Sequence, residues 1–365
     1  MKKKPRRKRK KRYGRGKGLS TGVRAAALFL LILLLAGLVW CNKTEPVRQE
    51  GEVRAVWLAY VDFKSLGLYN KDEKTFRQNA EAFFQEAEKN AINTVYFHVR
   101  AFRDASYPSQ HFAMSKYIWN KKENISYDPL KIMVKLAHKH NMELHAWLNP
   151  YRGYDLEQPI LDPASEKSTE EILLCVDEIL KNYKVDGIHF DDYFYKEDSQ
   201  VPESEKKENV NKMVAAVYDK VKEYGEDLQF GISPAGNVSY CESIGADVKT
   251  WLSQEGYLDY VVPQIYWTDQ HSAKWREKMF TDTLEEWISL NKQKVPLYPG
   301  LALYRTGQVS TDDPGWGKSR QNIAEQLVLL REKGCGGFAL FSAKDFYRNS
   351  AGKELRNYQK EVVKK

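Results

Sequence analysis

Two adjacent carboxylic acids, Asp191 and Asp192, are the residues of this 365-residue chain that most directly suggest chemistry. They end an apolar, β-prone stretch that begins at Val185, and an aromatic cluster follows them. This is the pattern of a buried parallel strand that delivers acidic groups to a cleft. Because side chains alternate along a strand, we expect Asp191 to share a face with His189 and Tyr193. Asp192 should then lie on the opposite face, and a polar loop or helix cap is the alternative interpretation.

The elements around this stretch alternate between strand-like and helix-like patterns, which predicts an α/β fold. The predicted strands are 53–60, 94–100, 142–148, 185–191, 229–233, 257–265, 295–301 and 337–341. The predicted helices lie near 75–90, 128–140, 169–183, 203–224, 246–255, 273–291, 319–333 and 352–363. Eight such units with right-handed crossovers suit a closed (β/α)8 TIM barrel. A doubly wound open sheet is the alternative, but no glycine-rich dinucleotide turn follows the first strand.

The predicted strand ends carry polar side chains interleaved with tyrosine and tryptophan. In a TIM barrel, functional groups follow the C-terminal ends of the strands. Aromatic faces stack on sugar rings while amides, guanidinium groups and carboxylates bind hydroxyls, so this composition indicates a carbohydrate site. Trp57 and Trp147 fall inside strands and are predicted to pack in the core. The candidate substrate-binding residues are Arg100, Asn149, Tyr151, Arg152, His189, Tyr193, Ser233, Gln264, Tyr266, Trp267 and Tyr304.

Glycoside cleavage usually needs two carboxyl groups, one protonated and one ionised. Asp191 is the first candidate for one of them. Asp192 either tunes the proton affinity of Asp191 or is the second group, and Asp104 is the next candidate. A 2-acetamido group on the sugar can replace the second carboxylate as nucleophile. The histidines lack metal-ligand spacing, so we assign neither a metal nor another cofactor.

The N-terminus differs in composition from the rest of the chain. Residues 1–24 contain 13 of the 57 basic residues and no acidic one, so residues 25–365 hold 44 basic against 49 acidic residues. A basic surface for nucleic acid is therefore absent from the predicted barrel. We expect a basic cytoplasmic tail (1–24), an apolar transmembrane or signal-anchor segment (25–40), a linker (42–51) and a barrel domain (52–363).

The positive tail should stay in the cytoplasm and place the barrel outside the cell, anchored to the membrane. The apolar run is shorter than the roughly 20 residues that a comfortable spanning helix needs, and long for the core of a signal peptide. An uncleaved anchor is the first expectation, and cleavage with secretion is the second. Lipidation of Cys41 comes third, because Trp40 occupies the position where a small residue is needed.

Several sequence blocks resemble the glycosyl-hydrolase-like family 10, in the family's order. They are 52–57, 99–100 with 107–109, 147–152, 186–194, 231–234, 262–267 and 337–342. The resemblance runs from about Glu52 to about Phe346 and implies a (β/α)8 barrel with glycosidase activity, often in the cell envelope. Ala101-Phe102-Arg103-Asp104 departs from the family's more usual Pro-x-Gly-Asp, although Asp104 is retained.

The fourth predicted strand also resembles the chitinase pattern D-G-x-D-x-D-x-E. Asp186 and Asp191 match two of its four acidic positions, whereas His189 and Tyr193 occupy the other two. Because Tyr193 stands where the acid of that pattern would be, the chitinase mechanism cannot be transferred whole.

The sequence as a whole predicts a glycoside hydrolase, exported and membrane-anchored, that acts on an amino-sugar-containing cell-wall polysaccharide. The resemblance implies peptidoglycan strands as the first substrate. A non-catalytic glycan-binding barrel and, further behind, a polysaccharide deacetylase are the alternatives. A binding barrel would not need Asp191, and a deacetylase would need a metal.

Overall fold

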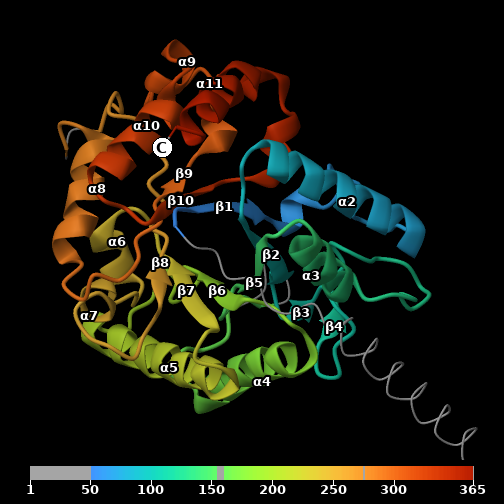
Figure 1. Cartoon of the computed structure of the whole chain (residues 1–365). Helices are drawn as coiled ribbons and strands as arrows, with labels where there is room; N and C mark the ends of the chain where they lie inside the picture. The colour runs from blue at the N-terminus through green and yellow to red at the C-terminus, as the bar shows by residue number, and fades with distance from the viewer. Residues whose placement is uncertain (1–50, 154–159, 274–275, 365) are drawn as a thin grey trace, which may run out of the picture. The chain divides into compact units, whose positions relative to one another are not determined.

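Eight parallel strands form the centre of the structure, a computed structural model that describes residues 51–153, 160–273 and 276–364. The strands lie in the order β8-β7-β6-β5-β2-β1-β10-β9. Backbone bridges from Val261 to Leu297 and from Gln264 to Gly300 connect the two ends of that order. The sheet therefore curls into a TIM-like α/β barrel (Figure 1). The strands are β1 (Val53–Leu58), β2 (Thr94–Arg100), β5 (Glu143–Leu148), β6 (Gly187–Asp191), β7 (Gln229–Ser233), β8 (Tyr260–Val261), β9 (Gly300–Leu301) and β10 (Gly337–Leu340).

Helices surround the sheet and cover the outer faces of its strands (Figure 1). The side chain of Asp72 caps the start of α2 and that of Asp128 caps the start of α3, each by accepting from a free backbone N–H group. The α-helices are α2 (Glu73–Lys89), α3 (Pro129–Lys139), α4 (Glu166–Asn182), α5 (Glu203–Tyr224), α6 (Val238–Ser243), α7 (Val248–Trp251), α8 (Met279–Leu290), α9 (Gly315–Lys318), α10 (Asn322–Glu332) and α11 (Gly352–Val362). The short 3-10 helices are η1 (Tyr60–Asp62), η2 (Leu303–Arg305), η3 (Ala343–Tyr347) and η4 (Asn349–Ala351).

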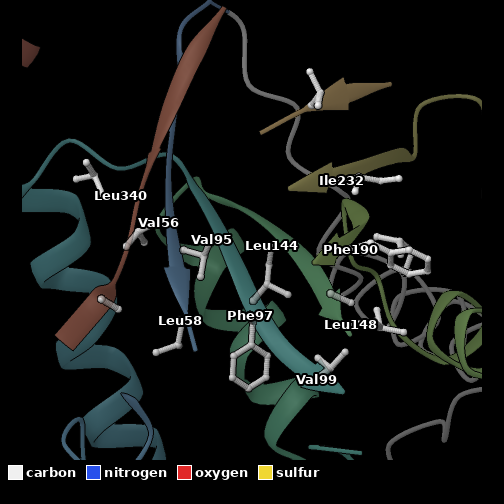
Figure 2. Close-up of a cluster of buried hydrophobic side chains, with 14 of the residues drawn as sticks. Val56, Leu58, Val95, Phe97, Val99, Leu144, Leu148, Phe190, Ile232 and Leu340 are labelled. Carbon is white, nitrogen blue, oxygen red and sulfur yellow. The ribbon is translucent and has the colours of Figure 1, made fainter. Parts of the chain in front are cut away.

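The two faces of the barrel strands have different environments. Outward-facing side chains such as Val56, Phe97 and Phe190 belong to the main hydrophobic core beneath the helices, part of which Figure 2 shows. The inward-facing residues form a separate cluster, because alternate residues of a strand point to opposite faces. The interior of the barrel is consequently rich in aromatic rings. That cluster contains Val53, Ala55, Trp57, Ala59, Tyr96, Trp147, Tyr260, Val262, Tyr298 and Ala339.

The predicted α/β fold with eight parallel strands is confirmed. Each predicted strand contains an observed one, but β8 and β9 are only two residues long. Pro263, Pro296 and Pro299 lie in these two predicted segments. Proline has no N–H to donate to a ladder, so the pairing there continues through single bridges instead of long strands.

The excursion between β2 and α3 contains a structure that was not predicted. A small parallel ribbon of β3 (Asp104–Ala105) and β4 (Ala113–Met114) forms within it. A hydrogen bond from the Ser106 amide to the Val99 carbonyl (2.8 Å) attaches this ribbon to the end of β2, and one from the Ser115 amide to the Ala105 carbonyl (2.7 Å) continues the pairing of β4 with β3. The ribbon therefore lies beside the C-terminal ends of the barrel strands.

The predicted tail (1–24), apolar segment (25–40) and nearly all of the linker (42–51) lie outside the described residues. Within the part of the chain that the structure describes, no helix is long and apolar enough to cross a membrane. The signal anchor stays a prediction.

Candidate active site

A cavity of about 270 Å³ opens at the C-terminal ends of the barrel strands. Each of the eight strands, or the loop that follows it, contributes at least one side chain to its lining. This is the position at which TIM barrels carry their working residues. The lining residues are Trp57, Ala59, Tyr60, Val61, His98, Trp147, Asn149, Arg152, Asp191, Asp192, Tyr193, Ser233, Gln264, Tyr266, Tyr304 and Phe341.

The two aspartates lie side by side in this lining. Asp191 is the last residue of β6, and its Oδ1 accepts hydrogen bonds from Gln264 Nε2 (3.1 Å) and from the Asp192 amide (2.9 Å). The prediction that Asp191 points into the cleft is confirmed. The prediction that Asp192 lies on the opposite face is wrong, because the strand ends at Asp191 and the chain bends. Because Asp192 is no longer part of the strand, the alternation of strand side chains does not point it toward the helices.

The pKa values of the two carboxyl groups are shifted to different extents. Burial raises the pKa of Asp192 well above its usual value, and the charge and hydrogen bond of Asp191 raise it further. Burial also raises the pKa of Asp191, but hydrogen bonds from Asp192 and Gln264 and the charge of Arg152 oppose that rise. Burial thus raises the pKa of both carboxyl groups, and the repulsion between two neighbouring negative charges favours a state in which one of them is protonated.

An aromatic wall lies beside the aspartates, in which Tyr60 and Tyr193 line the cavity while Phe102 and Tyr117 pack against Tyr60 outside its lining. The guanidinium carbon of Arg152 lies 3.9 Å from the ring centre of Tyr193 and 4.9 Å from that of Phe102. Phe102 stacks on Tyr117 with ring centres 5.4 Å apart, and Tyr117 meets Tyr60 edge-on at 4.6 Å. Phe102 and Tyr117 belong to the unpredicted excursion, so this wall depends on elements that the strand pattern alone does not reveal.

The cavity floor was missed as a functional surface. Trp57 and Trp147 were predicted to be core residues, and although they are 1% and 3% exposed, both line the cavity. His98 stacks on Trp147 with ring centres 3.7 Å apart. Their position in the sequence could have indicated this role, because each tryptophan is the next-to-last residue of its strand and faces the inside of the barrel.

Several polar atoms of the floor make no close hydrogen bond to another described residue. Both ring nitrogens of His98, the indole nitrogen of Trp147 and Oδ1 of Asn149 are buried without a hydrogen-bond partner among the described residues. Burial, reinforced by the charge of Arg152, holds the pKa of His98 well below its usual value, so this imidazole is neutral. Buried polar atoms normally find partners. The polar neighbours of the His98 ring are the Asn149 side chain and the Arg100 backbone, whose hydrogen bonds oppose the fall of its pKa.

His189 was predicted to bind substrate, but it lies buried below the floor. Trp57 Nε1, which can only donate, donates to His189 Nε2 (3.1 Å), so His189 Nδ1 donates to Tyr260 Oη (3.1 Å). Tyr260 Oη then donates to His145 Nδ1 (2.8 Å), and His145 Nε2 donates to Glu143 (3.2 Å). Burial holds the pKa of His189 well below its usual value, which keeps it neutral. His189 thus supports the floor from beneath.

Arg100 and Asp104 were predicted in the site, and neither lines the cavity. Arg100 is 1% exposed and donates to the carbonyl of Asn149 (3.2 Å) and to Glu171 (2.9 Å). It therefore fixes the loop after β5 instead of facing a ligand. Asp104 lies on β3, where its Oδ1 accepts from the Phe102 amide (3.1 Å). Its role is to shape the excursion that carries the aromatic wall.

Tyr151 and Trp267 were predicted to stack on substrate, and the structure places both outside the cavity lining. Tyr151 is fully buried in the main core. Trp267 packs its ring over Gly236, where an added Cβ would meet the ring at 2.7 Å, and its carbonyl accepts from Gln326 (2.8 Å). Both follow a strand end in sequence, but the chain turns each of them back toward the helix layer. The predicted residues that do line the cavity are Asn149, Arg152, Asp191, Asp192, Tyr193, Ser233, Gln264, Tyr266 and Tyr304.

A pair of adjacent carboxyl groups among aromatic rings and amides, at the mouth of an α/β barrel, is the type of site that glycoside hydrolases use. The sequence matches the family described as Glycosyl hydrolase-like 10 over residues 52–155 and 200–318. The chain belongs to this family. The matched segments flank β6, so Asp191 and Asp192 themselves lie between them. The prediction of an enzyme of the glycoside hydrolase class is confirmed.

Curated relatives and solved structures agree with this class. Glycosyl hydrolase YngK of Bacillus subtilis is 28% identical, with 84% of this chain and 71% of the relative aligned. Glycosyl hydrolase DigH of Escherichia coli K12 is 29% identical, with 80% and 85% aligned. The glycoside hydrolase domain of PgaB from Bordetella bronchiseptica has the same fold at a TM-score of 0.57 and 14% identity, covering 87% of this chain and 100% of that domain. A domain of a putative chitinase from Desulfitobacterium hafniense gives 0.58 at 11% identity, covering 86% and 100%.

Proposed function

We propose that this protein is an exported, membrane-anchored glycoside hydrolase that cleaves an amino-sugar-containing cell-wall glycan, with peptidoglycan strands as the first substrate. The observation that carries the proposal is the Asp191–Asp192 pair, two adjacent carboxyl groups that line an aromatic cavity at the strand ends and whose pKa values are both raised by burial. Cleavage of a glycosidic bond needs a proton for the leaving oxygen and negative charge near the developing oxocarbenium ion. The pair holds both.

In the proposed reaction Asp192 is the general acid, because burial and its neighbour keep it protonated. Ionised Asp191 stabilises the positive charge that develops at the sugar. No third carboxyl group is among the described residues that line the cavity. The paired carboxyl groups are neighbours in sequence, whereas the two acids of ordinary retaining enzymes stand roughly 5 Å apart across the bond. This arrangement favours nucleophilic help from a 2-acetamido group of the substrate.

The choice of an amino-sugar glycan has two supports. A 2-acetamido group offers both the nucleophile that the cavity lacks and an amide that the polar lining residues Asn149, Ser233 and Gln264 can bind. A similar solved domain is named a putative chitinase, and chitin is an amino-sugar polymer. The apolar segment 25–40 with its basic tail supports export to the compartment where cell-wall glycan is found.

The test is digestion of peptide-stripped peptidoglycan strands by the purified full-length protein, with the products identified by mass spectrometry. We expect shortened glycan fragments with wild type and none with Asp191→Asn. Equal binding of strands by both proteins with cleavage by neither would support the non-catalytic glycan-binding barrel. Cleavage of acetamide groups with intact glycosidic bonds would support the deacetylase.

Export has its own test. Protease added outside intact cells should digest the barrel domain and leave the basic tail protected. A barrel protected from that protease would contradict membrane anchoring with the barrel outside. A mature N-terminus near residue 42 would instead show cleavage and secretion.

A further inference from the structure

Arg152 is the only cationic side chain among the described residues that line the cavity. The other basic group of the lining, His98, is neutral because burial depresses its pKa. A glycan made only of neutral sugars gives such a cation no charged partner. The presence of a positive charge beside the proposed cleavage point therefore calls for a specific reason.

Its geometry restricts what it can bind. The guanidinium carbon lies over the rings of Tyr193 (3.9 Å) and Phe102 (4.9 Å), one from the loop after β6 and one from the excursion after β2. Aromatic rings cover the faces of a guanidinium group and leave its in-plane N–H donors open. A planar carboxylate is the acceptor that matches two parallel in-plane donors.

Within the part of the chain that the structure describes, no side chain or backbone group takes up the donors of Arg152. Among the described residues, the guanidinium group has no hydrogen-bond or ion-pair partner, in contrast to Arg100 and Arg103, which both pair with Glu171. It forms no ion pair with Asp191 or Asp192 either, although its charge lowers the pKa of both. The carboxylates of the lining thus leave the in-plane donors of Arg152 open among the described residues.

We propose that Arg152 binds a carboxylate carried by the sugar next to the scissile bond, so that the enzyme selects acid-bearing glycans over neutral ones. This inference rests on the proposed glycosidase function and narrows its substrate class. In peptidoglycan strands every second sugar carries a lactyl ether with a free carboxylate once the peptide is removed. Chitin has the same amino-sugar backbone without that acid. Arg152 thus distinguishes the two polymers.

The experiment compares two substrates that differ only in charge. Peptide-stripped strands are used as they are or after carbodiimide activation and borohydride reduction, which converts each carboxylate to a neutral alcohol. Initial rates give kcat/KM for wild type, Arg152→Gln, Arg152→Lys and Lys116→Gln. Lys116 is the matched control, since it is an exposed cation on the same side of the barrel that lies over the Tyr117 ring, at 5.5 Å, but does not line the cavity.

We expect wild type and Lys116→Gln to cleave native strands about 30-fold or more faster than reduced strands, the usual effect of losing one partner of a desolvated charge pair. Arg152→Gln should cleave both at the slow rate, which abolishes the discrimination. Arg152→Lys should keep part of it, because lysine retains the charge without the planar donor pair. The loss should appear mainly in KM, since Arg152 binds the substrate rather than the reacting atoms.

Two results would overturn the inference. In the first, the Arg152→Gln variant keeps the wild-type preference for native strands over reduced strands. In the second, Arg152→Gln lowers kcat/KM equally on native and reduced strands, which would show that Arg152 acts on the aspartate pair or on folding. Thermal unfolding and the Arg152→Lys variant separate those two causes. Failure of wild type to cleave either substrate would contradict the proposed function itself, and the inference with it.

Discussion

Two polar regions share the interior of one barrel and differ in how their buried polar atoms are satisfied. In the upper region, at the cavity floor, His98, Trp147 and Asn149 have buried polar atoms that make no close hydrogen bond to another described residue. In the lower region, His189 and His145 use both ring nitrogens in the chain that runs from Trp57 to Glu143. Both regions are equally buried, so burial alone does not distinguish a binding surface from a structural core.

The difference has an energetic meaning. A buried polar atom without a partner costs about 1–3 kcal/mol, and a fold keeps such atoms where a ligand or water can satisfy them. A chain in which every member is satisfied instead specifies one packing arrangement. Substitutions in the upper region should therefore change catalysis and spare stability, and substitutions in the lower region should do the reverse.

The largest effect is expected at Asp191. Asp191→Asn should lower kcat on glycan strands by about 10³-fold or more, which corresponds to about 4 kcal/mol of barrier. The amide keeps the shape of the side chain and can still contact Gln264, so thermal unfolding should stay close to wild type. Steady-state rates on peptide-stripped strands provide the measurement. If the Asp191→Asn protein is both inactive and strongly destabilised, the expectation that the upper region affects catalysis but not stability is wrong.

Asp192→Asn should cost less, roughly 10²-fold on glycan strands, the usual worth of a general acid. An aryl glycoside with a good leaving group does not need that proton, so the loss on such a substrate should nearly vanish. Parallel assays on strands and on a dinitrophenyl glycoside check this expectation. Equal losses of rate on both substrates would show that Asp192 is not the general acid and that it acts by tuning the pKa of Asp191.

Asp192 also makes a prediction about stability and pH. Its folded-state pKa is raised, so the folded protein holds a proton that the unfolded chain releases above a pH of about 4. Stability is therefore lost as pH rises through this window toward the raised pKa. Asp192→Asn removes that loss and should be more stable than wild type at pH about 7 and similar at pH about 3. Urea unfolding at the two pH values measures the difference, and a destabilised variant at neutral pH contradicts the raised pKa.

Much of this architecture could be predicted from the sequence, and the reasons for the failures are local. The inward direction of Asp191 and the eight strands follow from alternation and apolar patterning, which depend on nearby residues. Tyr151 and Trp267 were misplaced because both follow strand ends, whereas their orientation depends on the path of each loop. Phe102 entered the site through an excursion whose fold depends on contacts distant in sequence.

The cavity floor could have been found from the same patterning. Trp57 and Trp147 occupy inward positions one residue before the end of their strands, and such positions can be buried and still face a ligand. His189 shows the opposite case, since it lies two residues before the end of β6 and is covered. In this barrel, an inward-facing side chain one residue before the end of its strand lines the cavity floor. One that lies two residues before the end is covered and supports the floor from below.

The comparison between the two regions can be tested with a matched pair of hydroxyl deletions. Tyr260→Phe removes an oxygen bonded to both His189 and His145, which leaves two buried imidazole nitrogens without partners. It should lower the free energy of unfolding by about 2 kcal/mol. Tyr151→Phe removes a buried hydroxyl whose one polar neighbour, Thr169, makes no close hydrogen bond with it, so the loss of stability should be much smaller. Urea unfolding of both variants measures the contrast, and equal losses would show that partners do not decide the cost.

The smallest effect is expected at the floor itself. Trp147→Phe removes the unpartnered indole N–H while keeping an aromatic ring for His98 to stack on. If that N–H binds a substrate hydroxyl or amide, its loss should raise KM several-fold, about 1 kcal/mol, and leave kcat nearly unchanged, because the bond is made before and during reaction alike. The loss of ring volume should cost stability no more than the roughly 1 kcal/mol of a modest core truncation. An unchanged KM on glycan strands would mean that the indole N–H faces water in the complex, and the upper region would then bind sugar through ring faces alone.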